Sequence, residues 1–140
     1  MLEDEVKDFL NRNACERYNG EDNLATIINK WHEPFGVEFA KKLNYPSIEL
    51  VRKYKDEFEK YGVYVDRQNL NITNTNVVLF NCVAELDYSQ PTQTYSVILY
   101  SDNVVTIKAK DYAFVVINEL TNKNTVLIED DITAIVSRSN

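Results

Sequence analysis

Few residues in this sequence have side chains that could act as nucleophiles, bases or soft metal ligands. His32 is the only histidine, and the two cysteines, Cys15 and Cys82, are distant from it and from each other along the chain. A zinc site needs several His or Cys ligands, and a catalytic thiol needs a base within hydrogen-bonding reach. We therefore predict no catalytic residue, no metal site and no bound cofactor. His32 is expected at a helix C-terminus, where the helix dipole stabilises a protonated imidazole, and Cys82 is expected to be buried in the core.

Acidic side chains form two groups whose spacing could serve acid–base chemistry or a divalent cation. Glu85 and Asp87 are two residues apart and lie on the same face of a predicted strand. The run Glu129-Asp130-Asp131 lies at a junction between strands, but successive residues of a strand point to opposite faces. The run cannot act as one cluster unless the chain turns there, and we interpret Asp130-Asp131 as a turn.

The chain has 140 residues, with 15 basic and 22 acidic side chains and a net charge of −7. Nucleic-acid-binding proteins carry the opposite excess, and an anionic membrane surface would repel this chain, so we expect neither partner. An acidic balance suits a basic protein partner, or simply solubility. The acidic N-terminus and the lack of a long apolar run predict neither a signal peptide nor a membrane span, so we expect a cytoplasmic protein.

The composition changes near Gly62, which divides the chain into a helical part, residues 1–62, and a sheet part, residues 63–140. Val, Ile and Thr number 7 in the first part and 27 in the second, and β-branched residues favour strands. We expect both parts to form one domain over 1–140. Apolar spacings of three and four residues predict helices over 2–19, from Asp22 to Trp31 and from Pro46 to Gly62, with a short extra segment over 37–43.

Alternating apolar residues after Gly62 predict about six strands, and we see no internal repeat. Ser101-Asp102-Asn103 is interpreted as a hairpin loop that places Tyr100 opposite Val104. The predicted fold is therefore α+β, with three N-terminal helices and the short extra segment packed on one face of a curved antiparallel β-sheet of about six strands. The predicted core includes Leu10, Ile28, Phe58, Phe80, Val97 and Ile107.

The face of the predicted sheet that points away from the helices is the candidate binding surface. A fully solvated face would be mostly polar, whereas a tyrosine beside β-branched residues has the composition of an interface centre. The alternative is that the sheet curls and buries part of both faces. The candidate partner-binding residues are Ile98, Tyr100, Val104 and Thr106, flanked by Glu85 and Asp87.

These features favour a small, acidic, non-enzymatic protein-binding module that docks a basic protein. Inhibitors of bacterial toxins, the immunity proteins, have this size and charge, and the Asn and Lys content suits a bacterial or phage genome. A second hypothesis is self-association through the same sheet face. A third is a small-molecule-binding protein or enzyme with a pocket between helices and sheet, lined by Trp31, Tyr54 and Tyr95, with His32 or Glu85 as the polar group.

Overall fold

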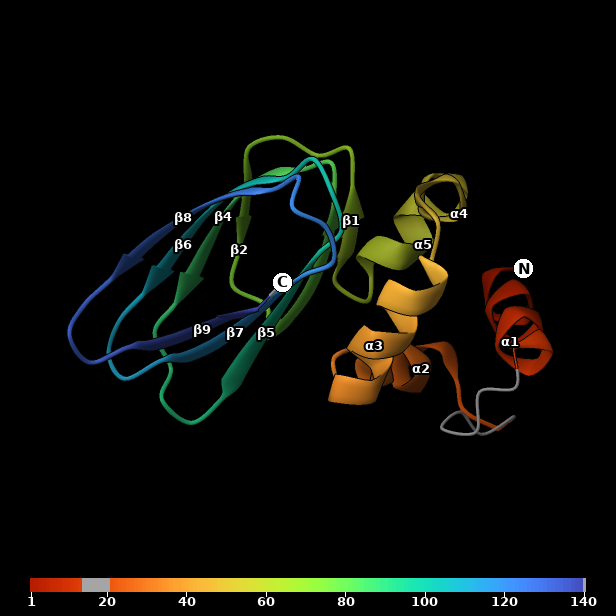
Figure 1. Ribbon diagram of the computed structural model, residues 1–140, viewed down its shortest axis with the longest axis horizontal. Coiled ribbons are helices and arrows are strands. Elements are labelled where there is room, and N and C mark those ends of the chain that lie inside the picture. Colours follow the sequence, from red (N-terminus) through yellow and green to blue (C-terminus); the bar gives the residue numbers. More distant parts are fainter. Residues whose placement is uncertain (14–20, 140) are drawn as a thin grey trace.

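A computed structural model describes residues 1–13 and 21–139, and in these residues five short helices precede a β-solenoid (Figure 1). No helix within these ranges combines the length and the apolar character needed to cross a membrane. The helices lie together at one side of the strands (Figure 1). They are α1 (Leu2–Arg12), α2 (Leu24–Trp31), α3 (Pro34–Leu43), α4 (Ile48–Lys53) and α5 (Lys55–Glu59).

The helix boundaries differ from the predicted ones for local reasons. Pro34 begins α3, because a proline in the first helical turn has no N–H that the helix would need. The predicted third helix divides into α4 and α5 at Tyr54, whose ψ of 37° lies outside the helical range. Asn23, rather than Asp22, caps α2, and its side chain accepts from the Thr26 N–H. The predicted continuation of the first helix over 14–19 lies outside the described residues.

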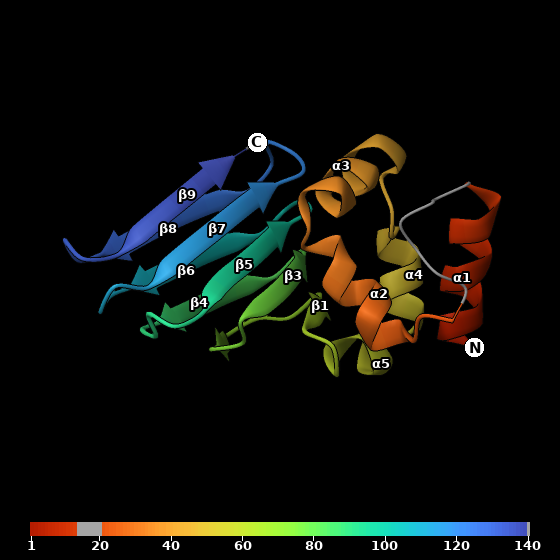
Figure 2. The ribbon, with the colours of Figure 1, turned by 90° about the horizontal axis from the view of Figure 1, so that it is seen from below.

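The strands form two sheets in which every neighbouring pair is parallel. Sheet A has the order β1-β3-β5-β7-β9 and sheet B the order β2-β4-β6-β8, so each coil adds one strand to each sheet. The two sheets face each other across the interior (Figures 1 and 2). The strands are β1 (Val63–Val65), β2 (Leu70–Ile72), β3 (Asn76–Phe80), β4 (Val83–Tyr88), β5 (Thr94–Leu99), β6 (Val104–Ala109), β7 (Phe114–Glu119), β8 (Thr125–Asp130) and β9 (Ile135–Ser139).

The predicted antiparallel sheet is therefore wrong, and so is the predicted hairpin. Tyr100 does not pair with Val104, because Val104 pairs with Val83 in the preceding coil. The segment 101–103 carries the chain from sheet A to sheet B instead of turning it back within one sheet. Alternating side chains and β-branched residues occur in parallel and antiparallel strands alike, so the strand pattern could not distinguish the two topologies.

From β3 onward the strands recur at intervals of 20 or 21 residues, whereas the first coil is shorter, with Val63 aligned to Val78 and Leu70 to Ala84. The expectation of no internal repeat is therefore wrong. In sheet A, Val97 aligns with Val77, 20 residues earlier, and in sheet B, Val126 aligns with Val105, 21 residues earlier. The spacing repeats but the residue types do not, since Leu99 aligns with Glu119 one coil later. Such a period is the sequence signature of a solenoid, in which each coil contacts only its neighbours.

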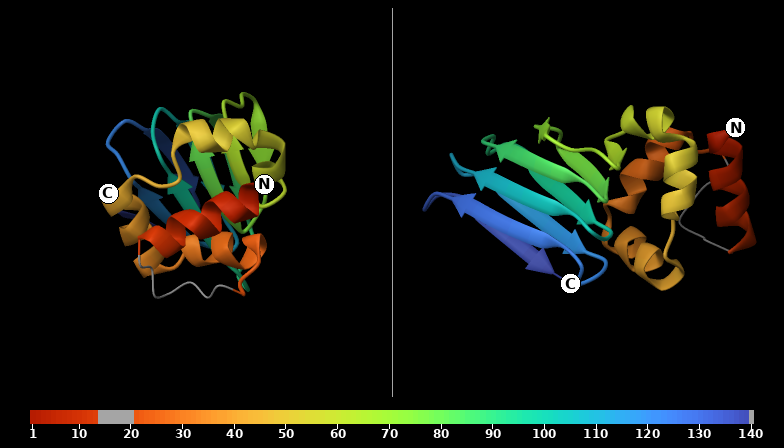
Figure 3. Two further views of the ribbon diagram at one scale, coloured as in Figure 1. Left: turned by 90° about the vertical axis from the view of Figure 1, so that its right-hand side faces the viewer. Right: turned by 90° about the horizontal axis from the view of Figure 1, so that it is seen from above.

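Sheet A is covered by the helices over only part of its outward side, since Phe114 on β7 and Ile135 on β9 are exposed. Its inward side chains fill the interior between the two sheets, and its outward side chains on β1, β3 and β5 belong to the core that the helices share. The helices lie together at one side of the strands in Figure 3. The six predicted core residues are confirmed as buried. Leu10, Ile28, Phe58 and Phe80 belong to the core that the helices form with the outward side of sheet A, and Val97 and Ile107 lie in the solenoid interior.

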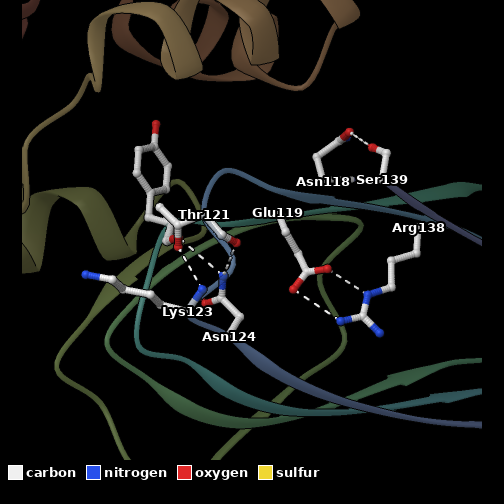
Figure 4. Close-up of polar contacts among 8 residues, drawn as sticks. Asn118, Glu119, Thr121, Lys123, Asn124, Arg138 and Ser139 are labelled. Atoms are coloured by element: carbon white, nitrogen blue, oxygen red, sulfur yellow. Dashed lines mark hydrogen bonds and ion pairs between the residues drawn. The ribbon is translucent and has the colours of Figure 1, made fainter.

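Asparagine side chains stabilise the corner at which the chain crosses from sheet A to sheet B. Asn103 Oδ1 accepts from the Cys82 backbone N–H over 2.8 Å, and its Nδ2 donates to the Leu79 carbonyl and to Asn124 Oδ1. Asn124 Nδ2 donates in turn to the Thr121 carbonyl (Figure 4). The stacked amides thus satisfy buried backbone groups of successive turns. Cys82 is buried, as predicted, at the equivalent corner of the preceding coil.

Candidate functional site: the open face of sheet B

Two of the six candidate partner-binding residues do not lie on an exposed surface. Ile98 and Tyr100 are 2% and 6% exposed, because they belong to the outward side of sheet A that the helices cover. The Tyr100 hydroxyl donates to the Tyr45 carbonyl over 2.7 Å, and its ring stacks on Phe80. The prediction that these two residues face away from the helices is wrong, because it depended on the antiparallel hairpin.

The other four candidates share one uncovered face, the outward side of sheet B. Glu85 on β4 aligns with Thr106 on β6, and Val104 and Asp87 lie on the same two strands and point the same way. The alternate residues of these strands fill the solenoid interior, which fixes this orientation. We call this surface the open face. Its residues are Asn71, Val83, Glu85, Asp87, Val104, Thr106, Lys108, Thr125, Leu127 and Glu129.

The open face combines exposed apolar side chains with charges. Val104 is 50% exposed and Leu127 is 55% exposed. Lys108 Nζ lies 2.7 Å from Glu85 Oε1, and this hydrogen-bonded carboxylate raises the pKa of Lys108. Such an exposed ion pair adds little stability, but it neutralises the lysine on this face. Asp87 and Glu129, which flank Lys108 in register, form no ion pair within the described part of the chain.

A depression of about 540 Å³ continues the open face at the carboxyl ends of its strands. Its wall contains more carboxylates than ammonium groups. Because Lys108 is paired with Glu85, Lys110 is the remaining cation among the lining residues. The carboxylates are those of Asp87, Glu129, Asp130 and Asp131.

The acidic run around the depression is held by the turn that follows β8. Asp131 Oδ1 accepts from the backbone N–H groups of Thr133 and Ala134 and from the Thr133 hydroxyl. These bonds, of which the one from the Thr133 hydroxyl has the largest effect, lower the pKa of Asp131 and favour its charged form. The predicted turn is confirmed for Asp131, while Asp130 is the last residue of β8. In the part of the chain that the structure describes, no three His, Cys, Asp or Glu side chains are placed to hold a metal ion.

A second cavity, of about 450 Å³, lies between α3 and sheet A and contains the only histidine of the chain. His32 is the C-terminal cap of α2, and its Nδ1 lies 2.7 Å from Ser96 Oγ. Burial lowers the pKa of His32 to about 4, so the imidazole is neutral at pH 7 and the expected protonated form is wrong. Thr94 and Asn118 add a hydroxyl and an amide to the wall of this cavity, which we call the His32 cleft.

The Ser96–His32 pair lacks the other parts of a nucleophilic site. Ser96 lies within β5, and its backbone N–H donates to the Thr75 carbonyl over 2.7 Å, so this N–H cannot stabilise an oxyanion. Within the described residues, no carboxylate is hydrogen-bonded to the His32 ring to orient it. The pair therefore has the geometry of a polar binding wall rather than of a catalytic dyad.

Of the pocket residues named from the sequence, only His32 lines the cleft. Trp31 lies in the core between the helices and sheet A, and Tyr95 lies in the solenoid interior. The Tyr54 hydroxyl donates to a Glu5 carboxylate instead. Sequence reasoning missed Ser96, because its approach to His32 over 64 residues depends on the parallel topology.

Comparisons with known proteins found no relative of this chain. No protein-family model matches the chain, and neither a curated protein nor a solved structure matches it. The open face and the His32 cleft are therefore the two features of the molecule that indicate a function.

Proposed function

We propose that this protein is a non-enzymatic binding module whose open face docks a basic protein. The observation that carries the proposal is the outer side of sheet B, which ends in a depression lined by four carboxylates and by Lys110, a lysine with no ion pair among the described residues. Like-charged carboxylates around a concave surface attract Lys and Arg side chains and speed their encounter. An inhibitor that neutralises a basic partner is the kind of protein that this surface suits.

The composition and rigidity of the open face support the same function. Val83, Val104 and Leu127 are exposed apolar side chains on three adjacent strands. Apolar contacts at the centre with charges at the rim are the usual organisation of a protein interface. β4 and β6 each form ladder hydrogen bonds with a neighbouring strand on both sides. Because these strands are already ordered, little conformational entropy would be lost on binding.

Site-specific photo-cross-linking tests this proposal. A photo-reactive residue at Thr106, on the open face, is compared with one at Asp56, an exposed position on α5. In a lysate of the organism that encodes the chain, we expect Thr106 to give an adduct with a protein of net positive charge and Asp56 to give none. The double variant Asp87→Lys, Glu129→Lys should abolish the adduct.

The matched control reverses the same number of charges elsewhere. Asp4→Lys, Asp56→Lys changes the net charge equally, but both residues are exposed on helices away from the open face. This variant, with the photo-reactive residue at Thr106, should retain the adduct. A partner of net negative charge, or equal loss of the adduct in both double variants, would contradict the proposal.

A second candidate function is supported by the His32 cleft, which could hold a small polar molecule. A neutral imidazole, two hydroxyls and an amide face the cavity between α3 and sheet A, so its wall offers hydrogen bonds beside the apolar Val37 and Val116. Ligand-detected NMR with a library of small polar compounds tests this function. Binding that is lost in Asn118→Leu, with an unchanged melting temperature, would support it, and binding that persists would contradict it.

A further inference from the structure

Both sheets end in strands that pair on one side only, at the side of the solenoid opposite β1. In the described part of the chain β9 is the last strand of sheet A and β8 the last strand of sheet B (Figure 2). The backbone N–H groups of Thr125 and Ile135 donate to the preceding coil. Because N–H groups alternate in direction along a strand, those of Val126, Ile128 and Val136 point away from the solenoid.

The apolar interior is open at the same end. Three interior residues are buried, namely Val105, Ile107 and Val115. The residues aligned with them in the last coil, Val126, Ile128 and Val136, are only half-buried. Ile132 and Ile135 add fully or largely exposed apolar area beside them. An exposed strand edge with apolar side chains is a site at which another strand adds.

The last coil is held firmly in place, so its edges are formed before any partner arrives. Arg138 Nε donates to Glu119 Oε2 over 2.6 Å, and the Ser139 hydroxyl donates to Asn118 Oδ1 over 2.7 Å (Figure 4). Glu119 is only 3% exposed, so this pair joins β9 to a buried charge of β7. The hydrogen bond to the carboxylate raises the pKa of Arg138.

The geometry of the end selects its occupant. The two free edges run in opposite directions (Figure 1). Sheets that stack face to face are about 10 Å apart, and apolar side chains lie between these two. An extended peptide would cover one edge and leave the other edge and the interior exposed. A partner that covers all three must present two edges at the same spacing with an apolar layer between them. The end of a second copy of this chain has these features.

We propose that two copies of the protein join end to end through their last coils. A two-fold axis perpendicular to the solenoid axis brings β8 and β9 of one copy against the same two strands of the other. Whether β8 then meets β8 or β9 of the second copy, the paired strands run antiparallel. Val126, Ile128 and Val136 of the two copies then meet and continue the apolar interior. The outward N–H and C=O groups of both edges gain partners, while the open face stays uncovered.

The oligomeric state of the full chain tests this proposal. Light scattering and sedimentation should give about twice the monomer mass of 16.3 kDa, with dissociation on dilution. Leu127→Lys, Ile135→Lys places like charges on the exposed sides of both end strands and should raise the dimer dissociation constant about tenfold or more. The matched control is Val83→Lys, Val104→Lys, two exposed positions of the open face away from the end, and it should leave the dimer intact.

Hydrogen exchange on the unmodified protein provides a second measurement if the end variant fails to fold. The outward N–H groups of Val126, Ile128 and Val136 should become more protected as the protein concentration rises. Val136→Pro removes one outward N–H and no ladder bond within the protomer, and it should weaken the dimer. A protein that is monomeric at all concentrations would overturn the proposal. A dimer that is broken by the control would also overturn it, since the open face, to which Leu127 also belongs, would then be the interface.

Discussion

Asn103 and Asn124 lie at the same corner of successive coils, with 2.9 Å between Asn103 Nδ2 and Asn124 Oδ1. Asn103 also accepts from the Cys82 N–H and donates to the Leu79 carbonyl, so one side chain connects three consecutive coils. It is 1% exposed, and solvent therefore cannot replace these partners.

We expect Asn103→Leu to lower the free energy of unfolding by about 3 kcal/mol, because a buried N–H and a buried carbonyl would each lose a partner. Urea denaturation measures the loss. Asn122→Leu, at an exposed position of the same corner, is the control and should change stability by no more than about 0.5 kcal/mol. Similar losses in the two variants would contradict the role of the stacked amides.

The pH dependence of stability should report the burial of His32. Burial lowers its pKa from 6.5 to about 4, so between these values the unfolded chain binds a proton that the folded protein excludes. Stability should therefore fall as the pH decreases from 6.5 to 4, by about 3 kcal/mol in total, and should not depend on His32 above pH 6.5. Denaturation of the wild type and His32→Gln at pH 7 and pH 4.5 isolates this contribution, because the carboxylates titrate in both proteins. An equal loss in both would contradict it.

Tyr100→Phe tests the position of this residue beneath the helices. The variant leaves the buried Tyr45 carbonyl without its donor and should cost about 1–2 kcal/mol of stability, measured by urea denaturation. Tyr100→Ala also removes the ring that stacks on Phe80 and should cost about 3–5 kcal/mol. Neither change should alter the affinity of the folded protein for a partner on the open face. Reduced affinity at unchanged stability would return Tyr100 to the binding surface.

Charge reversal at the depression should act on the rate of association with a basic partner. We expect Asp87→Lys to lower the association rate constant about tenfold at low ionic strength, and much less at high salt, where the charges are screened. Asp56→Lys on α5 is the control with the same change in net charge. Stopped-flow or surface-based kinetics measure the association rate of each variant with the partner that the cross-linking experiment identifies. A change confined to the dissociation rate would contradict electrostatic steering.

The sequence predicts which residues are buried better than it predicts how the strands connect. Phe58 and Val97 follow apolar spacings that hold in any arrangement of the helices and strands, and both are fully buried. The pairing of Val104 depends on whether the turn before it stays in one sheet or crosses to the other, and the residues 101–103 suit both. The recurring spacing of Val77 and Val97, and of Val105 and Val126, is the signal that indicates a solenoid.

The candidate site residues also differ in whether their positions depend on how the strands connect. Glu85 and Thr106 share a face because alternation along each strand places them there, and parallel or antiparallel pairing preserves that side. Only the predicted hairpin places Ile98 on this face, and in the structure Ile98 lies on the other sheet. The contact of His32 with Ser96 joins a helix end to a strand that the sequence alone could not place beside it.

The coil-by-coil register also makes the length of this protein adjustable. The core that the helices form with sheet A includes side chains of β1, β3 and β5 and, after β7, Leu120, so β8 and β9 lie outside it. A tandem duplication of residues 104–124, one full 21-residue period, would insert a coil whose neighbours present the same edges and the same corner amide as before. Growth or shrinkage by whole coils would widen or narrow the ribbed outer surface in steps of about 4.8 Å, without redesign of the helical layer. Proteins of this architecture could thus change the width of their outer surface by duplicating segments rather than by substituting residues.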